Sequence, residues 1–179
     1  MDLMEGLLNR RSIRQYDQNK KVSREQIEQI IKAAQYAPSA HNRQPWEFLI
    51  LEDKAILAEI PKVQPWTTFV KNASCAILVC ANTDAAFGRD DDIRGHYSFG
   101  DIDCALCSQN LMLAAHSMGL GTCFCGVAPM DDTEQKFAQM FNLPQNIRPF
   151  GLIALGYPEV LPKQPQDRFV AEKIHWEKW

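Results

Sequence analysis

The sequence lacks the segments that would place a chain in or across a membrane. No apolar run approaches the roughly 20 residues that a membrane-spanning helix needs. The first residues, Met1 to Gly6, have neither the basic start nor the apolar centre of a signal peptide. We therefore expect a cytoplasmic protein with no membrane partner.

Several functional motifs are also missing. The net charge is −3 and the basic residues form no long stripe, which argues against a nucleic-acid partner. The sequence has no HExxH motif, no convincing Ser-His-Asp or Cys-His arrangement, and no G-x-G-x-x-G dinucleotide fingerprint. We accordingly predict no catalytic nucleophile and no metal site.

The six cysteines admit two interpretations. Cys104-x-x-Cys107 and Cys123-x-Cys125 imitate the spacing of metal-ligand pairs, but they fall in helical and strand-like segments without the tight turns of zinc knuckles. Free cysteine is usually buried, and a chain of this size without an export signal has little need of disulfides. Reduced, buried thiols are favoured, and a structural metal or cluster is the alternative.

The hydrophobic pattern predicts helices and strands within one domain over residues 1–179. Ser23 and Gln26 form a capping box at the start of an amphipathic helix, which Pro38 should end. Apolar runs predict strands, and residues 85–100 have little periodicity and resemble a functional loop. Helices are predicted over residues 23–37, 55–60, 101–118 and 131–141, and strands over 47–51, 75–81, 122–127 and 151–157.

The final segment, residues 158–179, is too polar to form a core of its own. It nevertheless carries large apolar side chains that need cover: Phe169, Ile174, Trp176 and Trp179. An arm lying over a partner subunit would provide that cover.

Two short stretches point to chemistry. Arg10-Arg11-Ser12-Ile13-Arg14 offers three guanidinium groups and a hydroxyl, and arginine matches phosphate oxygens bidentately. The stretch from Pro38 to Trp46 is a turn rich in Pro, Ser and Asn that runs into an apolar strand. Such a turn can present backbone amides and short polar side chains to a flat heteroaromatic ligand.

These stretches, with three later ones, resemble the FMN-dependent nitroreductases, specifically the short single-domain members. The family-like features are Arg-Arg-Ser-x-Arg, Pro-Ser-x-x-Asn-x-Gln-Pro-Trp, the helix around Gln109-Asn110, Gly119-Leu120-Gly121-Thr122-Cys123 and Ala154-Leu155-Gly156-Tyr157-Pro158. They occur in the family's order over residues 10 to about 176. The resemblance implies an α+β, nitroreductase-like fold, with a central, mostly antiparallel sheet flanked by helices. It also implies an intertwined homodimer with one FMN in each of two interface sites.

The resemblance also implies cofactor-binding roles for individual residues. Arg10 and Ser12 would hold the FMN phosphate, with Arg11 close by and Arg168 completing the site. Arg14 would sit beside the pyrimidine edge of the flavin, where a fixed cation favours the reduced form. The remaining cofactor-binding residues would lie around the ring, the first four from the other subunit: Pro38, Ser39, Ala40, Asn42, Phe124, Cys125 and Gly126.

The predicted function is an oxidoreductase that passes hydride from NAD(P)H through FMN to a small electrophilic acceptor such as a nitroaromatic or a quinone. Because no Rossmann fingerprint holds the nicotinamide donor, donor and acceptor would use the same face in turn, which gives ping-pong kinetics. Two alternatives remain: a non-catalytic flavin-binding redox sensor that uses its cysteines, and a dedicated-substrate relative of dehalogenase-like or flavin-fragmenting type.

Some side chains near these stretches have two interpretations each. His41 is either a substrate contact or a hydrogen-bonding group that stabilises the turn. Tyr97, Phe99 and Trp66 either line the pocket or pack in the core.

Overall fold

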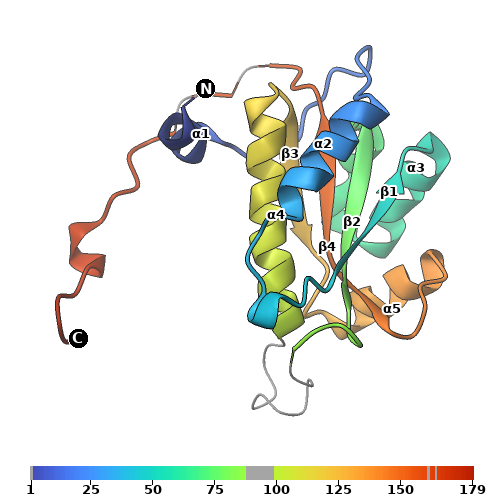
Figure 1. Cartoon of the computed structure of the whole chain (residues 1–179). Helices are drawn as coiled ribbons and strands as arrows, with labels where there is room; N and C mark the ends of the chain where they lie inside the picture. Colours follow the sequence, from blue (N-terminus) through green and yellow to red (C-terminus); the bar gives the residue numbers. More distant parts are fainter. Residues whose placement is uncertain (1, 88–98, 161, 164) are drawn as a thin grey trace.

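The computed structural model describes residues 2–87, 99–160, 162–163 and 165–179. Within these residues, four antiparallel strands form one sheet in the order β1-β2-β4-β3 (Figure 1). The predicted α+β class with an antiparallel sheet is confirmed. The strands are β1 (Trp46–Leu51), β2 (Cys75–Asn82), β3 (Gly121–Gly126) and β4 (Ile147–Gly156).

Helices cover both faces of this sheet, and the chain has a core on each side. On one face lie α2 (Arg24–Ala34) and the long α4 (Phe99–Ser117), and on the other lie α3 (Lys54–Val63) and α5 (Asp131–Met140) (Figure 1). Alternate residues of β2 therefore enter different clusters, Ile77 toward α2 and α4 and Leu78 toward α3 and α5. This explains why β2 reads as a continuous apolar run.

The capping box predicted for α2 is present. Ser23 N donates to Gln26 Oε1 at 3.0 Å, and Ser23 Oγ accepts from Gln26 N at 3.3 Å. Two orphan backbone donors at the helix start are thereby satisfied.

Helix α4 has two apolar sides of different fate. One side, which includes Cys104 and Leu111, is fully buried against the sheet. The other side exposes Ile102 and Leu106, which are 47% and 42% accessible. A helix that is apolar around its circumference needs cover on both sides, and the described part of this chain leaves Ile102 and Leu106 uncovered.

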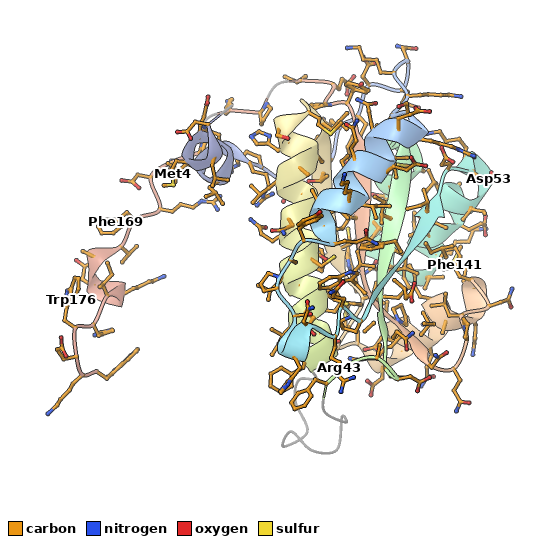
Figure 2. All side chains as sticks on the ribbon, viewed as in Figure 1. Met4, Arg43, Asp53, Phe141, Phe169 and Trp176 are labelled. Atoms are coloured by element: carbon orange, nitrogen blue, oxygen red, sulfur yellow. The ribbon has the colours of Figure 1, made fainter. Side chains whose placement is uncertain are left out.

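Both ends of the chain lie beside the body rather than in it. Helix α1 (Leu3–Asn9) stands near the C-terminal end of α4, and the C-terminal arm extends away from the sheet (Figures 1 and 2). The arm's Phe169 and Trp176 are 71% and 83% exposed, as expected for a segment that lacks cover within its own chain.

Several predicted boundaries were wrong, and one helix was not predicted. Pro61 lies inside α3 rather than ending it, because burial of Leu57 and Ile60 holds the helix through its last turn. Strand β4 begins at Ile147, four residues earlier than expected, and α1 was not expected at all. The helix predicted from residue 101 begins at Phe99, and most of the predicted loop over residues 85–100 lies outside the described residues.

The six cysteines are free and buried, as predicted. Among the described residues, none of the helices is both long and apolar enough to span a bilayer.

Candidate functional site

The arginines of the first motif gather where the chain leaves α1 and meets β3. Ile13 N donates to Thr122 O at 2.8 Å, and Ser12 forms an isolated parallel bridge with Thr122. This short pairing fixes the Arg10–Arg14 segment against the outer side of β3. The contact therefore places the arginine motif beside β3.

Arg168 of the C-terminal arm belongs to the same cluster. Burial is the largest cause that lowers the pKa of Arg10, and the positive charges of Arg168 and Arg11 lower it further. Within the described part of the chain, none of Arg10, Arg11, Arg14 and Arg168 forms an ion pair with a carboxylate. Like charges held together without acidic partners are the arrangement that binds a phosphate group.

Arg148 shows how this chain treats an arginine with a structural role. Its guanidinium donates to Asp101 Oδ2 at 3.1 Å and to Glu134 Oε2 at 2.7 Å, which links β4 to α4 and α5. Among the described residues, the cluster at Arg10 has no such carboxylates, so packing alone does not account for it.

A pocket of about 100 Å³ opens beside Arg10 and Arg11, and its lining includes a residue that sequence reasoning missed. His116, near the end of α4, lines it together with Arg10, Arg11 and Thr122. His116 Nε2 is buried and has no hydrogen-bond partner in the part of the chain that the structure describes. Burial, and then the charge of Arg10, lower the pKa of His116, while Glu5 opposes the shift.

We expect His116 to make stability pH-dependent. Because the folded protein resists protonation of His116, the unfolded chain binds more protons below pH 6.5, the ordinary pKa of this side chain. Stability should therefore fall as the pH is lowered through that value. Urea unfolding at pH 5 to 7 should show a smaller fall for His116→Asn. His175→Asn is the control, because His175 is exposed. If His116→Asn lost as much unfolding free energy between pH 7 and pH 5 as the wild type does, the assignment would be contradicted.

Strand β3 offers backbone groups along its outer edge. Thr122 directs its carbonyl away from β4, and backbone groups alternate along an antiparallel strand, so Phe124 and Gly126 point outward as well. Cys125 lies between them with its backbone turned toward β4. Gly126 O accepts from Nε2 of the fully buried Gln64, a contact that sequence reasoning also missed.

The two cysteines of β3 lie just beneath this edge. A hydrogen bond from Cys125 is the largest cause that lowers the pKa of Cys123, to about 7, against the effect of burial. The charge of Arg14, a hydrogen bond donated by Ser12, and the charge of Arg10 lower it further. The hydrogen bond with Cys123 and then burial raise the pKa of Cys125. Cys123 and Cys125 are only 1% and 7% exposed, so neither thiol is offered to solvent.

The second motif forms a turn at the opposite end of α4. Pro38 follows α2, and Ser39 begins a short 3-10 segment, Ala40–Asn42. Ala40 N donates to Asp103 Oδ1 at 3.0 Å, which ties the turn to the first turns of α4 (Figure 1). Asp103 is 2% exposed and is the third residue that sequence reasoning did not assign to the site.

The aromatic residues with two interpretations are now placed in part. The ring centroids of His41 and Phe87 lie 3.9 Å apart, and those of Phe87 and Phe99 lie 5.6 Å apart in an edge-on arrangement. His41 thus packs on an aromatic ring beside the turn. Trp66 is 59% exposed and Tyr97 lies outside the described residues.

The chain does not bring its two motifs together. Asp103 marks the level of the turn on α4 and His116 marks the level of the arginines, and 13 residues at 1.5 Å each put these levels about 20 Å apart. One chain therefore holds the two halves of the predicted site at opposite ends of one helix.

Comparisons with known proteins agree with this fold. The Nitroreductase family is matched over residues 7–157. A provisionally named NADH dehydrogenase/NAD(P)H nitroreductase of Methanothermobacter thermautotrophicus is 39% identical over 179 residues, covering 100% of this chain and 88% of that protein.

Solved structures extend the match to the whole fold. A crystal structure of a provisionally named NADH dehydrogenase/NAD(P)H nitroreductase from Parabacteroides distasonis superposes with a TM-score of 0.87 at 34% identity, covering 98% of each chain. An FMN-dependent nitroreductase from Clostridium difficile gives a TM-score of 0.84 at 25% identity, covering 99% of this chain and 100% of that one. The chain belongs to the nitroreductase family.

Proposed function

We propose that this protein is an NAD(P)H-dependent FMN oxidoreductase that reduces small electrophiles such as nitroaromatics or quinones. The observation that carries the proposal is the cluster of arginines at the outer edge of β3, which has no carboxylate partner among the described residues. It lies within a fold whose relatives are named for NAD(P)H-dependent reduction and for FMN.

The residues present fit FMN. Arg10, Arg11, Ser12 and Arg168 would hold the phosphate, and Arg14, whose guanidinium lies 5.8 Å from the centre of the Phe69 ring, would place a cation at the pyrimidine edge. The outward backbone of β3 at Phe124 and Gly126, with Cys125 between them, would line the ring. When bound, FMN supplies the hydride chemistry for which the chain has no side chain of its own.

The site would be completed by a second copy of the chain. The turn with Pro38, Ser39, Ala40 and Asn42 and the arginine cluster lie at opposite ends of α4, so two α4 helices packed antiparallel about a two-fold axis would bring each turn toward the other copy's arginines. The exposed Ile102 and Leu106 on α4 and the uncovered arm would be buried in the same homodimer.

Mixed dimers test whether the site is shared. Arg10→Ala and Asn42→Ala should each weaken FMN binding as homodimers. When the two variants are unfolded and refolded together, half of the dimers are mixed and one site in each is intact, so about a quarter of all sites should recover full affinity. FMN titration would count them. No recovery would mean that one chain supplies both halves.

The first experiment is an absorbance spectrum of the purified protein before and after anaerobic addition of NADH or NADPH, with release and identification of the bound cofactor. We expect bound FMN that bleaches on addition. Acceptor screening and initial-rate patterns would then test the acceptor class and the ping-pong scheme. FMN that stays oxidised would favour the sensor alternative, and a colourless protein that FMN cannot reconstitute would overturn the cofactor assignment.

A further inference from the structure

The turn that follows α2 adopts a strained backbone. His41, Asn42 and Gln44 have φ values of 50°, 55° and 51°, in the left-handed region that residues other than glycine rarely occupy. Strained backbone persists only where the surroundings hold it, and it clusters at ligand sites. This turn therefore needs a structural cause.

Part of that cause lies within the turn. Gln44 N donates to Ser39 Oγ at 3.0 Å, and Gln44 Nε2 donates to Asn42 Oδ1 at 2.9 Å. These contacts shape the turn, but they do not attach it to the rest of the protein. The hydrogen bond from Ala40 N to Asp103 Oδ1 does so, across 63 residues of sequence.

Holding the turn with Asp103 destabilises the fold relative to an apolar residue at this position. Its carboxylate is almost completely buried, and within the described residues no cation pairs with it and Oδ2 has no hydrogen-bond partner. Burial raises the pKa of Asp103, although the Ala40 amide opposes the shift. A buried carboxyl with one hydrogen bond costs stability that an apolar side chain would not.

We propose that Asp103 is a positioning residue for cofactor binding. By accepting from the Ala40 amide it holds the strained turn in the form that presents Ser39, Ala40 and Asn42 to FMN. This inference rests on the proposed function for its ligand. Since the turn serves the site of the other subunit, Asp103 would act on the FMN whose phosphate is held by the second copy's arginines.

The test compares Asp103→Ala with Asp103→Asn, which keeps an acceptor oxygen in the same place. Ser108→Ala is the control, because Ser108 is equally buried on α4 and its hydroxyl has no partner among the described residues. Asp103→Ala should bind FMN about tenfold more weakly, the effect of losing one hydrogen bond. It should also speed hydrogen exchange at the Ala40 amide in cofactor-free protein. Asp103→Asn and Ser108→Ala should resemble the wild type in both measurements.

A second variant tests the same hydrogen bond in case Asp103→Ala does not fold. Ala40→Pro removes the same donor at the first position of a helical turn, where proline is tolerated, after a Ser39 that already has extended φ and ψ. It should weaken FMN binding to a similar degree, with no further loss when combined with Asp103→Ala.

Three outcomes would overturn the inference: wild-type FMN affinity in Asp103→Ala, unchanged exchange at Ala40, or an Asp103→Asn variant as weak as Asp103→Ala. If the wild type itself binds no FMN, the proposed function fails, and with it the role of Asp103 toward that ligand. The exchange rates would then still show whether Asp103 holds the turn.

Discussion

Replacing Arg10 and Arg168 together by alanine should weaken FMN binding about a thousandfold. Each guanidinium is expected to make charge-assisted hydrogen bonds to the phosphate, and such bonds contribute about 1.5–3 kcal/mol each. The two losses should not add fully, because removing one arginine also relieves its repulsion of the other. Fluorescence titration of the cofactor-free protein would measure both single variants and the double variant.

Riboflavin provides the matched ligand, because it carries the same ring and side chain without the phosphate. The double variant should bind riboflavin about as well as the wild type does. Arg24→Ala is the matched protein control, since Arg24 is exposed and pairs with Glu52 at the surface. Equal losses for FMN and riboflavin would show that the arginines support the fold rather than the phosphate.

The Gly156→Ala variant should lose about 3 kcal/mol of unfolding free energy, at the upper end of overpacking effects. A Cβ at Gly156 would lie 2.8 Å from Tyr16 Cδ1 and 3.1 Å from the backbone nitrogen of Ser74. Neither neighbour can easily move: Tyr16 is 3% exposed and its hydroxyl donates to Ile13 O at 2.6 Å. For a chain of this size the melting temperature should fall by about 6–12 °C.

Gly126→Ala is the control for this loss. Among the described residues, the nearest atom to a Cβ there would be Ala128 O at 3.7 Å, an ordinary van der Waals contact. The unfolding free energy of this variant, measured in urea, should stay within about 0.5 kcal/mol of the wild-type value. A Gly156→Ala protein as stable as Gly126→Ala would mean that Tyr16 has more freedom than its contacts indicate.

The parts of the fold that could be predicted are those with a local physical signal. The capping box at Ser23 marked the start of α2, and continuous apolar runs marked β1 and β2. At the beginning of β4 the local sequence indicated a loop rather than a strand. Arg148 and Pro149 look like loop residues, but Arg148 is neutralised by two carboxylates, and Pro149 pairs with Cys80 where the register shifts, a place that tolerates proline.

The candidate site divides in the same way. Its arginines and its turn could be recognised as short stretches with dense polar chemistry. Asp103 and His116 could not, because each looks like an ordinary residue of a helix until the fold places it. Asp103 meets Ala40 from 63 positions away, and His116 faces a segment more than one hundred residues earlier. A contact of that kind depends on topology, which no local pattern records.

The buried cysteines can report local unfolding of the protein. Two thiols lie on β2, two on α4 and two on β3, and all six are shielded in the native state. A brief pulse of a thiol-alkylating reagent would therefore leave the folded chain unmodified and mark only molecules that have opened. Peptide mapping of the marks would then tell whether the sheet centre, its edge or the long helix loosens first.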